Sequence, residues 1–322
     1  MKVVPSMDSG PSRTLREITS QPAVWGEAVS SVAAFADVLP RRGERVAVVG
    51  CGTSWFMAHA YAQLRENGGH GETDAFAASE FPYDRAYDRV LAISRSGTTT
   101  EVLELLHRVR GGAATGAITA DLGTPVMEAA DAVAVLDFAD EESVVQTRFA
   151  TAVLALLRAH LEAEGALPEG VRPMAEAIRD AERALAEPLD DGVLGAGQFT
   201  FLGTGWTYGL ALEAGLKMRE AAGAWTEAYP AMEYRHGPIS ITAPGRAVWV
   251  FGPLPEGLAG DVLAVGGTLA ADSGAVARDL DPLADLVRAQ RLAVVLAESR
   301  GYDPDRPRNL TRSVVLENAD AR

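Results

Sequence analysis

The sequence is poor in cysteine and in positive charge. Its one cysteine, Cys51, excludes a disulfide within the chain and a cysteine-rich zinc site. Lys and Arg number 29 against 44 Asp and Glu, which gives a formal net charge of −15. Because nucleic acid and anionic membranes attract positively charged surfaces, this balance argues against both as partners. A phosphorylated small molecule is still compatible with it, since a few donors can be concentrated at one site.

Long apolar runs are also missing. No stretch reaches the roughly 18 apolar residues that a membrane helix needs, and the polar N-terminal segment lacks the apolar core of a signal peptide. We therefore expect a soluble, cytoplasmic protein. With 322 residues, 48% of them hydrophobic and 23% charged, the chain is long enough for about two globular domains of ~150 residues each.

Short apolar runs alternate with stretches of helical length along most of the chain. The expected strands are residues 45–49, 89–93, 114–118, 133–136, 199–202 and 248–251. The expected helices are residues 54–65, 99–109, 143–163, 173–188 and 281–299. An N-terminal helical arm precedes them, and Pro22 is assigned to an early position of a helix there. This alternation predicts an α/β fold with doubly wound parallel sheets, covered by helices on both faces.

The chain carries an internal repeat. Residues 48–55 align with residues 201–208, and each copy has an apolar strand, a Gly-x-Gly turn, a hydroxyl residue and an aromatic residue. This order indicates duplication of an α/β unit. Trp55 and Tyr208 occupy the third glycine position of the dinucleotide fingerprint, where a bulky side chain blocks the close approach of a pyrophosphate. The repeat therefore argues against a nicotinamide or flavin enzyme, and no cofactor is expected.

The stretch 91–100 has the features of an anion-binding turn. An apolar strand ends there, Gly97 allows a sharp turn, and a helix follows. The free N–H groups at the helix start favour a phosphate. The hydroxyl donors are Ser94, Ser96, Thr98 and Thr99. Simple helix capping is the alternative, but four hydroxyls around one glycine favour an anion site. Residues 251–256 of the second half lack such a loop, so we expect one phosphate site per chain.

A charged helix in the second half carries a candidate catalytic group. Glu213, Lys217 and Glu220 are spaced by four and three residues, which places them on one helix face. An ordinary surface ladder of ion pairs has the same spacing. The helix follows the second Gly-x-Gly turn, however, so its start points to the carboxyl edge of the sheet, where α/β sites form. His236 lies soon after this helix, and the five histidines have no metal-ligand spacing, so no metal is expected.

Six motifs occur in the order typical of double sugar isomerase (SIS) domain proteins. They are residues 50–54, 78–81, 94–99, 212–220, 233–238 and 307–313. From about residue 10 to residue 322, the chain resembles the isomerase half of glucosamine-6-phosphate synthase and the stand-alone amino-sugar-phosphate isomerase/deaminase proteins. The resemblance implies two flavodoxin-like SIS domains in tandem. The implied parts are an arm (1–42), a first SIS domain (43–165), a helical connector (166–190), a second SIS domain (191–300) and an active-site tail (301–322).

The resemblance also implies roles for single residues. Glu220 would move a proton between C1 and C2, supported by Glu213 and Lys217. His236 would assist ring opening from the neighbouring subunit, which implies a homodimer. A positioned carboxylate and a group that titrates near neutrality suit this chemistry. The implied sugar-phosphate-binding set is Cys51, Gly52, Thr53, Ser54, Ser94, Arg95, Ser96, Thr98 and Thr99.

Three features depart from the synthase pattern. The glutaminase half with its N-terminal cysteine is missing, so glutamine-dependent amination is not expected. Arg312 occupies the place of a lysine at the sugar, and an arginine can hold an oxyanion but does not readily move a proton. Arg95 replaces a neutral glutamine in the phosphate loop and is expected to add a bidentate grip on the anion.

Three functions are compatible with these residues. The first is isomerisation or deamination of a hexose 6-phosphate, with an amino sugar such as glucosamine 6-phosphate as the expected substrate. The second is a dehydratase (lyase) that acts on N-acetylglucosamine 6-phosphate and expels the C3 hydroxyl, a step that Arg312 would assist. The third is a sugar-phosphate sensor, against which the presence of both Glu220 and His236 argues.

Overall fold

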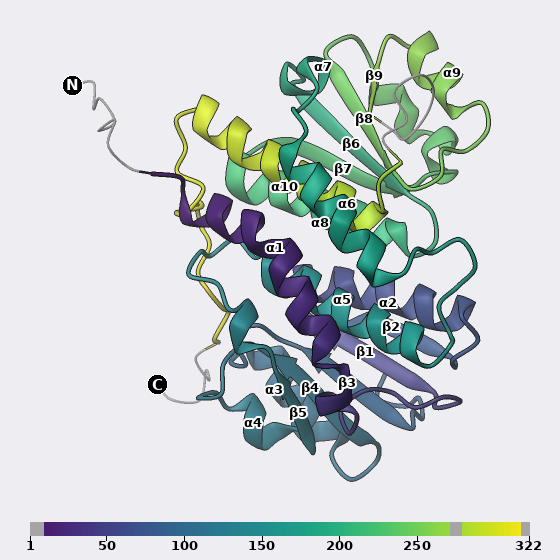
Figure 1. Ribbon diagram of the computed structural model, residues 1–322, viewed down its shortest axis with the longest axis vertical. Helices are drawn as coiled ribbons and strands as arrows, with labels where there is room; N and C mark the ends of the chain where they lie inside the picture. The colour runs from purple at the N-terminus through teal and green to yellow at the C-terminus, as the bar shows by residue number, and fades with distance from the viewer. Residues whose placement is uncertain (1–9, 271–278, 317–322) are drawn as a thin grey trace.

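The computed structural model describes residues 10–270 and 279–316 and contains two parallel β-sheets (Figure 1). The first consists of β1 (Val46–Gly50), β2 (Thr73–Ala77), β3 (Arg89–Ile93), β4 (Ala114–Thr119) and β5 (Ala132–Val135), in the order β2-β1-β3-β4-β5. The second consists of β6 (Gln198–Gly203), β7 (Trp225–Pro230), β8 (Arg246–Phe251) and β9 (Thr268–Ala270), in the order β7-β6-β8-β9. The predicted α/β fold with two parallel sheets in tandem is confirmed.

The strands β1 and β6 occupy matching places in the two sheets. Each lies between the second and third strands of its own half, which is the flavodoxin-like arrangement. Gly50 and Gly203, the first glycines of the two repeated turns, are the last residues of these strands. Because the strand order reverses at β1 and at β6, a crevice is expected outside their carboxyl ends. Both copies of the repeat therefore begin at a position suited to a binding site.

The longer helices lie mainly between the sheets and connect the two halves (Figure 1). They are α1 (Arg13–Ser30), α2 (Thr53–Asn67), α5 (Arg148–Ala163), α6 (Met174–Ala186), α8 (Thr207–Ala222) and α10 (Pro282–Ser299). On the outer sides lie α3 (Thr100–Val109), α4 (Val126–Ala129), α7 (Asp191–Leu194) and α9 (Leu258–Ala264). Short 3₁₀ helices span Val32–Phe35, Ala78–Glu80, Asp137–Ala139, Glu233–His236 and Pro238–Ile241.

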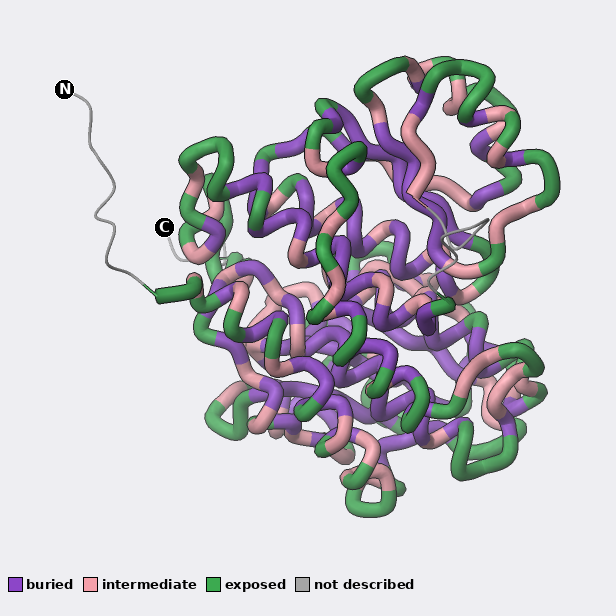
Figure 2. The backbone as a smooth tube through the Cα atoms, turned by 45° about the horizontal axis from the view of Figure 1, so that its top comes forward, coloured by how far each residue is buried: buried purple, intermediate pink, exposed green. Residues whose placement is uncertain are grey.

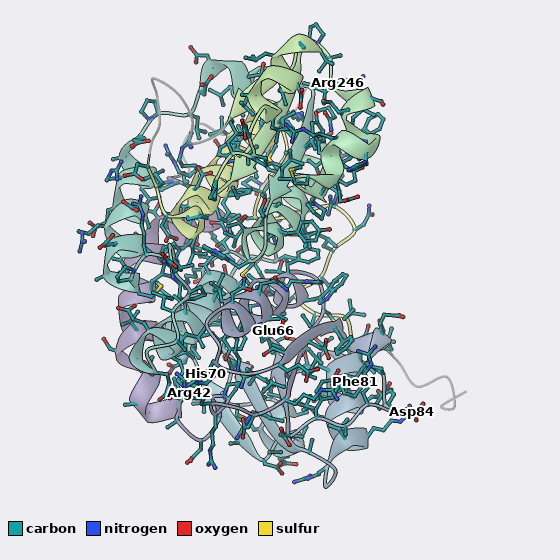
Figure 3. The ribbon with its side chains drawn as sticks, turned by 90° about the vertical axis from the view of Figure 1, so that its right-hand side faces the viewer. Arg42, Glu66, His70, Phe81, Asp84 and Arg246 are labelled. Atoms are coloured by element: carbon teal, nitrogen blue, oxygen red, sulfur yellow. The ribbon has the colours of Figure 1, made fainter. Side chains whose placement is uncertain are left out.

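One buried apolar core continues from the first half into the second through these helices (Figure 2). The two repeated helices, α2 and α8, pack directly against each other. At their crossing, a Cβ on Gly209 would lie 2.5 Å from the Phe56 carbonyl oxygen, so only glycine permits this approach. In Figure 3, Arg246 marks the second half, and Phe81 and Asp84 mark the opposite end in the first half. This close packing also brings the second half of α8, with Leu216, Lys217 and Glu220, to the carboxyl edge of the first sheet.

Pro22 does not occupy the expected early helix position. It lies in the middle of α1, where a proline leaves the carbonyl four residues earlier without its usual donor. That carbonyl belongs to Ile18, and the Gln21 side-chain amide donates to it at 3.0 Å. The local sequence thus replaces the lost hydrogen bond, and α1 continues to Ser30.

Other boundaries differ from the expected ones in ways that affect the site. The helix expected from residue 143 begins at Arg148, because residues 143–147 form a loop whose polar groups bind neighbouring segments. The strands β2, β7 and β9 were missed; they flank their sheets and are less apolar than the central ones. Residues 1–9 of the expected arm and 317–322 of the expected tail lie outside the described residues. None of the described helices is long and apolar enough to span a membrane.

Candidate active site

A cavity of about 190 Å³ opens at the carboxyl ends of β1 and β3. Five segments build its walls: the turn after β1, the loop after β3 with the start of α3, the loop before α5, the second half of α8 and the C-terminal tail. Of the predicted site residues, it is lined by Cys51, Gly52, Thr53, Ser54, Ser94, Arg95, Ser96, Thr99, Lys217, Glu220 and Arg312. Tertiary structure therefore gathers residues from both halves around one space.

The predicted phosphate loop forms one wall of this cavity. The strand β3 ends at Ile93, and the chain turns at Gly97, where φ is +59°. A Cβ on Gly97 would lie 2.1 Å from Thr124 Oγ1, so a larger residue is excluded by space as well as by conformation. The helix α3 then starts at Thr100, with its first N–H groups at the loop. The loop thus has the backbone geometry that an anion site requires.

The loop hydroxyls divide into two groups. Ser94 Oγ and Thr99 Oγ1 lie 3.4 Å apart, and both residues line the cavity. Thr98, in contrast, does not line it: its hydroxyl donates to Ser96 Oγ at 3.0 Å and lies 3.1 Å from Ser313 Oγ in the tail. Ser96 Oγ also accepts from the Thr98 N–H at 3.3 Å, which leaves the Ser96 hydroxyl hydrogen free to donate. Thr98 therefore acts in the structure as a tie to the tail.

The three charged residues of α8 form a buried ion cluster and not a surface ladder. Lys217 is 1% exposed and Glu213 is fully buried. Lys217 Nζ donates to Glu220 Oε2 at 2.5 Å and lies 3.5 Å from Glu213 Oε1. Of the two carboxylates, Glu220 reaches the cavity wall and Glu213 lies behind it. The helix thus presents one carboxylate to a ligand and keeps a lysine fixed beside it.

Burial and charge alter the protonation of this cluster. Burial raises the pKa of Glu213 to about 8, against the opposing effect of Lys217, so Glu213 is largely protonated at neutral pH. Burial also disfavours the Lys217 ammonium, but the carboxylates of Glu213 and Glu220 outweigh it and raise the pKa of Lys217. The cluster therefore carries a lysine cation and a cavity-facing carboxylate.

The cysteine in the first turn fits a packing role. Cys51 is half-buried and lines the cavity. Burial raises the pKa of its thiol, and the nearby Glu101 carboxylate adds to the effect. A thiol held in the protonated form is a poor nucleophile. The structure thus gives no support to a catalytic thiol at this position.

Two arginines do not have the contacts expected of them. Arg95 was expected to grip the phosphate with both terminal nitrogens, but these nitrogens donate to the backbone carbonyls of Ser143 and Arg312. Arg312 was expected at the sugar, but its guanidinium binds the Asp140 carboxylate at 2.6 and 2.9 Å and the Glu141 carbonyl. The loop at 140–143 supplies one acceptor to Arg95 and all of the acceptors named for Arg312, and the second acceptor of Arg95 is the Arg312 carbonyl itself.

His236 is separated from the cavity within one chain. It ends the short 3₁₀ helix Glu233–His236, is exposed, and does not line the cavity. Its assignment to ring opening thus needs a second copy of the chain, as the resemblance implied. Among the described residues, no three His, Cys, Asp or Glu side chains form a group that could hold a metal ion.

Sequence reasoning missed several residues of the cavity wall. Gln146 is one of them: its Oε1 is buried and has no hydrogen-bond partner among the described residues. Glu101, in the first turn of α3, has a similarly unpartnered Oε2. The tail adds Leu310, Thr311, Ser313 and Val314. The polar run before α5 was a signal for the Gln146 loop, but its spacing resembled a helix start.

Comparison with known proteins gives the family context. No protein-family model matches the chain. It is 30% identical over 345 residues to the isomerizing glutamine–fructose-6-phosphate aminotransferase of Methanothermobacter thermautotrophicus, covering 94% of this chain and 57% of the relative. The aminotransferase of the same name from Thermus thermophilus is 32% identical over 321 residues, covering 86% of this chain and 53% of the relative. The chain spans little more than half the length of these relatives.

A solved structure matches the chain over nearly its whole length. A glucosamine-6-phosphate deaminase from Thermotoga maritima has a TM-score of 0.79 and 26% sequence identity, and the match covers 95% of this chain and 100% of that one. The homologues of this chain are therefore the isomerase (SIS) half of these aminotransferases, and its two parallel sheets match the fold of sugar isomerase (SIS) domain neighbours such as the deaminase.

Proposed function

We propose that this chain is a phosphosugar isomerase or deaminase that acts on a hexose 6-phosphate, with an amino sugar such as glucosamine 6-phosphate as its substrate. The observation that carries the proposal is that the Ser94–Thr99 loop and the Glu220 carboxylate line the same cavity. A sugar phosphate has its anion at one end and its carbonyl carbon at the other. One cavity with a phosphate loop and a carboxylate suits such a molecule.

The proposed reaction begins with binding of the phosphate by the loop hydroxyls and the start of α3. In the open-chain sugar, Glu220 takes the proton from C2, and the electron pair moves toward the C1 carbonyl to give an enolamine. Lys217 donates to Glu220 Oε2 at 2.5 Å, which fixes the orientation of the base. The same ammonium lines the cavity and can stabilise the oxygen on which negative charge develops.

The fate of this intermediate decides the product. Return of the proton at C1 gives the 2-imino form of the ketose, and addition of one water with loss of ammonia yields the ketose phosphate. For a substrate with a hydroxyl at C2, the same transfer gives an enediol and then the ketose. Both outcomes use Glu220 as the general base, so the C2 substituent of the sugar selects between deamination and isomerisation.

The proposed active form is a homodimer in which His236 of one copy serves the cavity of the other. This proposal is supported by the exposed position of His236 and by its absence from the cavity wall of its own chain. An imidazole has one nitrogen that can accept a proton and one that can donate a proton, which suits proton transfer during ring opening. The dehydratase alternative has weaker support, because the Arg312 guanidinium that it requires at the sugar is bound to Asp140.

Proton NMR in D₂O would test the proposal. The protein would be incubated in turn with glucosamine 6-phosphate, N-acetylglucosamine 6-phosphate and fructose 6-phosphate. We expect loss of the C2 proton signal of glucosamine 6-phosphate, together with fructose 6-phosphate and ammonium as products. An olefinic product from the acetylated sugar would favour the dehydratase. If the sugar signals broaden but none of the three sugars exchanges a proton, the enzymatic proposal is overturned in favour of a sensor.

A further inference from the structure

Arg95 reaches from the phosphate loop to two other walls of the cavity. Arg95 is 1% exposed. Nη1 donates to the Ser143 carbonyl at 2.9 Å, and Nη2 donates to the Arg312 carbonyl at 2.8 Å. Ser143 precedes the cavity-lining Val144 and Gln146, and Arg312 belongs to the tail. One guanidinium thus joins three segments of the wall.

Two of the three segments are fixed independently of this guanidinium. The Arg95 carbonyl accepts from the Thr119 hydroxyl and the Ala120 N–H, both at 3.1 Å, which fixes the loop on the end of β4. The Ser143 N–H donates to Glu17 Oε1 at 3.2 Å, which fixes the second segment on α1. Arg95 therefore connects two segments, the phosphate loop and the segment at Ser143, that other hydrogen bonds already hold in place.

The tail is the third segment, and it has less support of its own. Residues 310–316 form no helix or strand, and Leu310 and Val314 are 42% and 55% exposed. Besides Arg95, the tail is tied by contacts of Ser313 with Thr98 and of Arg312 with Asp140 and the Glu141 carbonyl. Two further hydrogen bonds involve Thr100: its N–H donates to the Val314 carbonyl, and its Oγ1 accepts from the Leu316 N–H. The tail position thus depends on a few polar contacts, and the one from Arg95 is part-buried and comes from a residue that is 1% exposed.

The bonding of Arg95 makes this contact hard to replace. Within the described part of the chain, no carboxylate lies within 4.0 Å of its guanidinium, and its buried Nε has no hydrogen-bond partner. A buried cation is costly unless its donors are hydrogen-bonded, and here the two carbonyls accept one hydrogen bond from each terminal nitrogen, Nη1 and Nη2. The planar fork of arginine spans two separate acceptors, whereas a glutamine amide has one NH₂ group and a lysine one ammonium centre.

We propose that Arg95 is a positioning residue that holds the C-terminal tail over the cavity, and that it is not a direct ligand of the substrate phosphate. This role rests on the proposed function in one respect only, that the cavity takes a sugar phosphate. The hydroxyls and N–H groups of the loop bind the anion, and Arg95 keeps the backbone of Thr311–Val314 in the wall opposite. The guanidinium thereby couples the phosphate loop to the closure of the site.

The tail provides its own reporter. Trypsin cleaves after Arg312, and the carbonyl of that peptide bond is the group to which Arg95 Nη2 donates. We would digest the full-length, ligand-free protein briefly and follow by mass spectrometry the loss of the segment after Arg312. Arg95→Gln and Arg95→Lys would be compared with wild type. Because a part-buried, charge-assisted hydrogen bond to the Arg312 carbonyl is lost, we expect cleavage after Arg312 to accelerate by about tenfold or more in both variants.

Arg65→Gln is the matched control. Arg65 is also fully buried in the first half, and it also donates to backbone carbonyls, those of Arg41, Glu44 and Glu72, but it does not line the cavity. Its replacement is expected to lower the melting temperature while leaving cleavage after Arg312 at the wild-type rate. Cleavage after Arg308, four residues earlier, provides an internal reference for general loosening.

The outcomes separate this proposal from the proposed function. Unchanged cleavage after Arg312 in Arg95→Gln would overturn the positioning role. The role would also be overturned if Arg95→Gln accelerated cleavage after Arg308 as much as cleavage after Arg312, or if Arg65→Gln accelerated cleavage after Arg312 as much as Arg95→Gln does. Wild-type protection in Arg95→Lys would show that charge alone suffices and would also overturn it. Because the digestion uses ligand-free protein, accelerated cleavage would support the role even if no sugar phosphate were turned over. For an active enzyme, we further expect Arg95→Gln to raise KM for the sugar phosphate more than it lowers kcat.

Discussion

Lys217 Nζ donates to Glu220 Oε2 across 2.5 Å, from a position on α8 where the lysine is 1% exposed. The two residues are three positions apart, so the helix itself sets their spacing. On a surface such a pair contributes little, because water screens it. Here burial fixes the lysine, and the lysine fixes the carboxylate that faces the cavity. The i, i+3 spacing is common on helices, but here the buried Lys217 holds the Glu220 carboxylate in one orientation toward the cavity.

Replacing Glu220 by glutamine is expected to lower kcat by about 10²–10⁴-fold, the usual contribution of a general base. The dissociation constant for the sugar phosphate should stay close to that of wild type, because the Ser94–Thr99 loop is unchanged. Steady-state kinetics and calorimetric titration would measure the two quantities. Glu104→Gln, on the exposed side of α3, is the control with unchanged activity. Full activity in Glu220→Gln would show that another group takes the C2 proton.

Replacing Ser96 by alanine is expected to weaken binding of the phosphate end of the substrate. Ser96 Oγ accepts two hydrogen bonds from Thr98, so its own hydrogen is available for an anion. Loss of one hydrogen bond to a charged group corresponds to a rise in KM of roughly 10- to 100-fold. The comparison substrate is the same sugar without phosphate, for which variant and wild type should not differ. An equal loss on both sugars would assign Ser96 a general structural role.

The stability of the protein should depend on pH through Glu213. Burial raises the pKa of Glu213 to about 8 from 4.5, so the folded state binds a proton that the unfolded state has released. The stabilising contribution of this group is complete below pH 4.5 and is lost as the pH rises toward about 8. Glu213→Gln should therefore match wild type near pH 5 and exceed it increasingly toward pH 9 in urea unfolding. A constant difference across this range would contradict the assignment.

The opposite dependence is expected at His160. Burial lowers the pKa of His160 from 6.5 to about 4, and His70, 5.4 Å away between ring centroids, adds to the effect. Figure 3 locates His70 in the first half, near Arg42 and Glu66. Because the unfolded state gains a proton first, stability is lost as the pH falls from 6.5 to about 4. Melting temperatures of His160→Phe should fall less steeply over that interval. Parallel curves would show that other groups dominate acid unfolding.

Much of the fold could be predicted from the sequence because its signals are local. The apolar run Arg89–Ile93 was assigned its observed bounds, and β1 and β6 lay at the repeated Gly-x-Gly turns. Such runs mark strands that are buried on both faces. The flanking strands β2, β7 and β9 were missed because a partly exposed strand mixes polar and apolar residues. Pro22 was misplaced because its compensation comes from a neighbouring side chain, Gln21.

The features of the candidate site also fall into two groups, those predictable from local sequence and those that depend on tertiary contacts. The sequence by itself determined the anion loop, because glycine, hydroxyls and a helix start lie within a few residues there. It also determined the helical face shared by Glu213, Lys217 and Glu220. Only the tertiary structure decided that this face is buried against the first half, and that the Arg95 guanidinium binds the carbonyls of Ser143 and Arg312. Side-chain chemistry limits what a residue can bind, but burial and the acceptors that the fold brings within reach decide what it does bind.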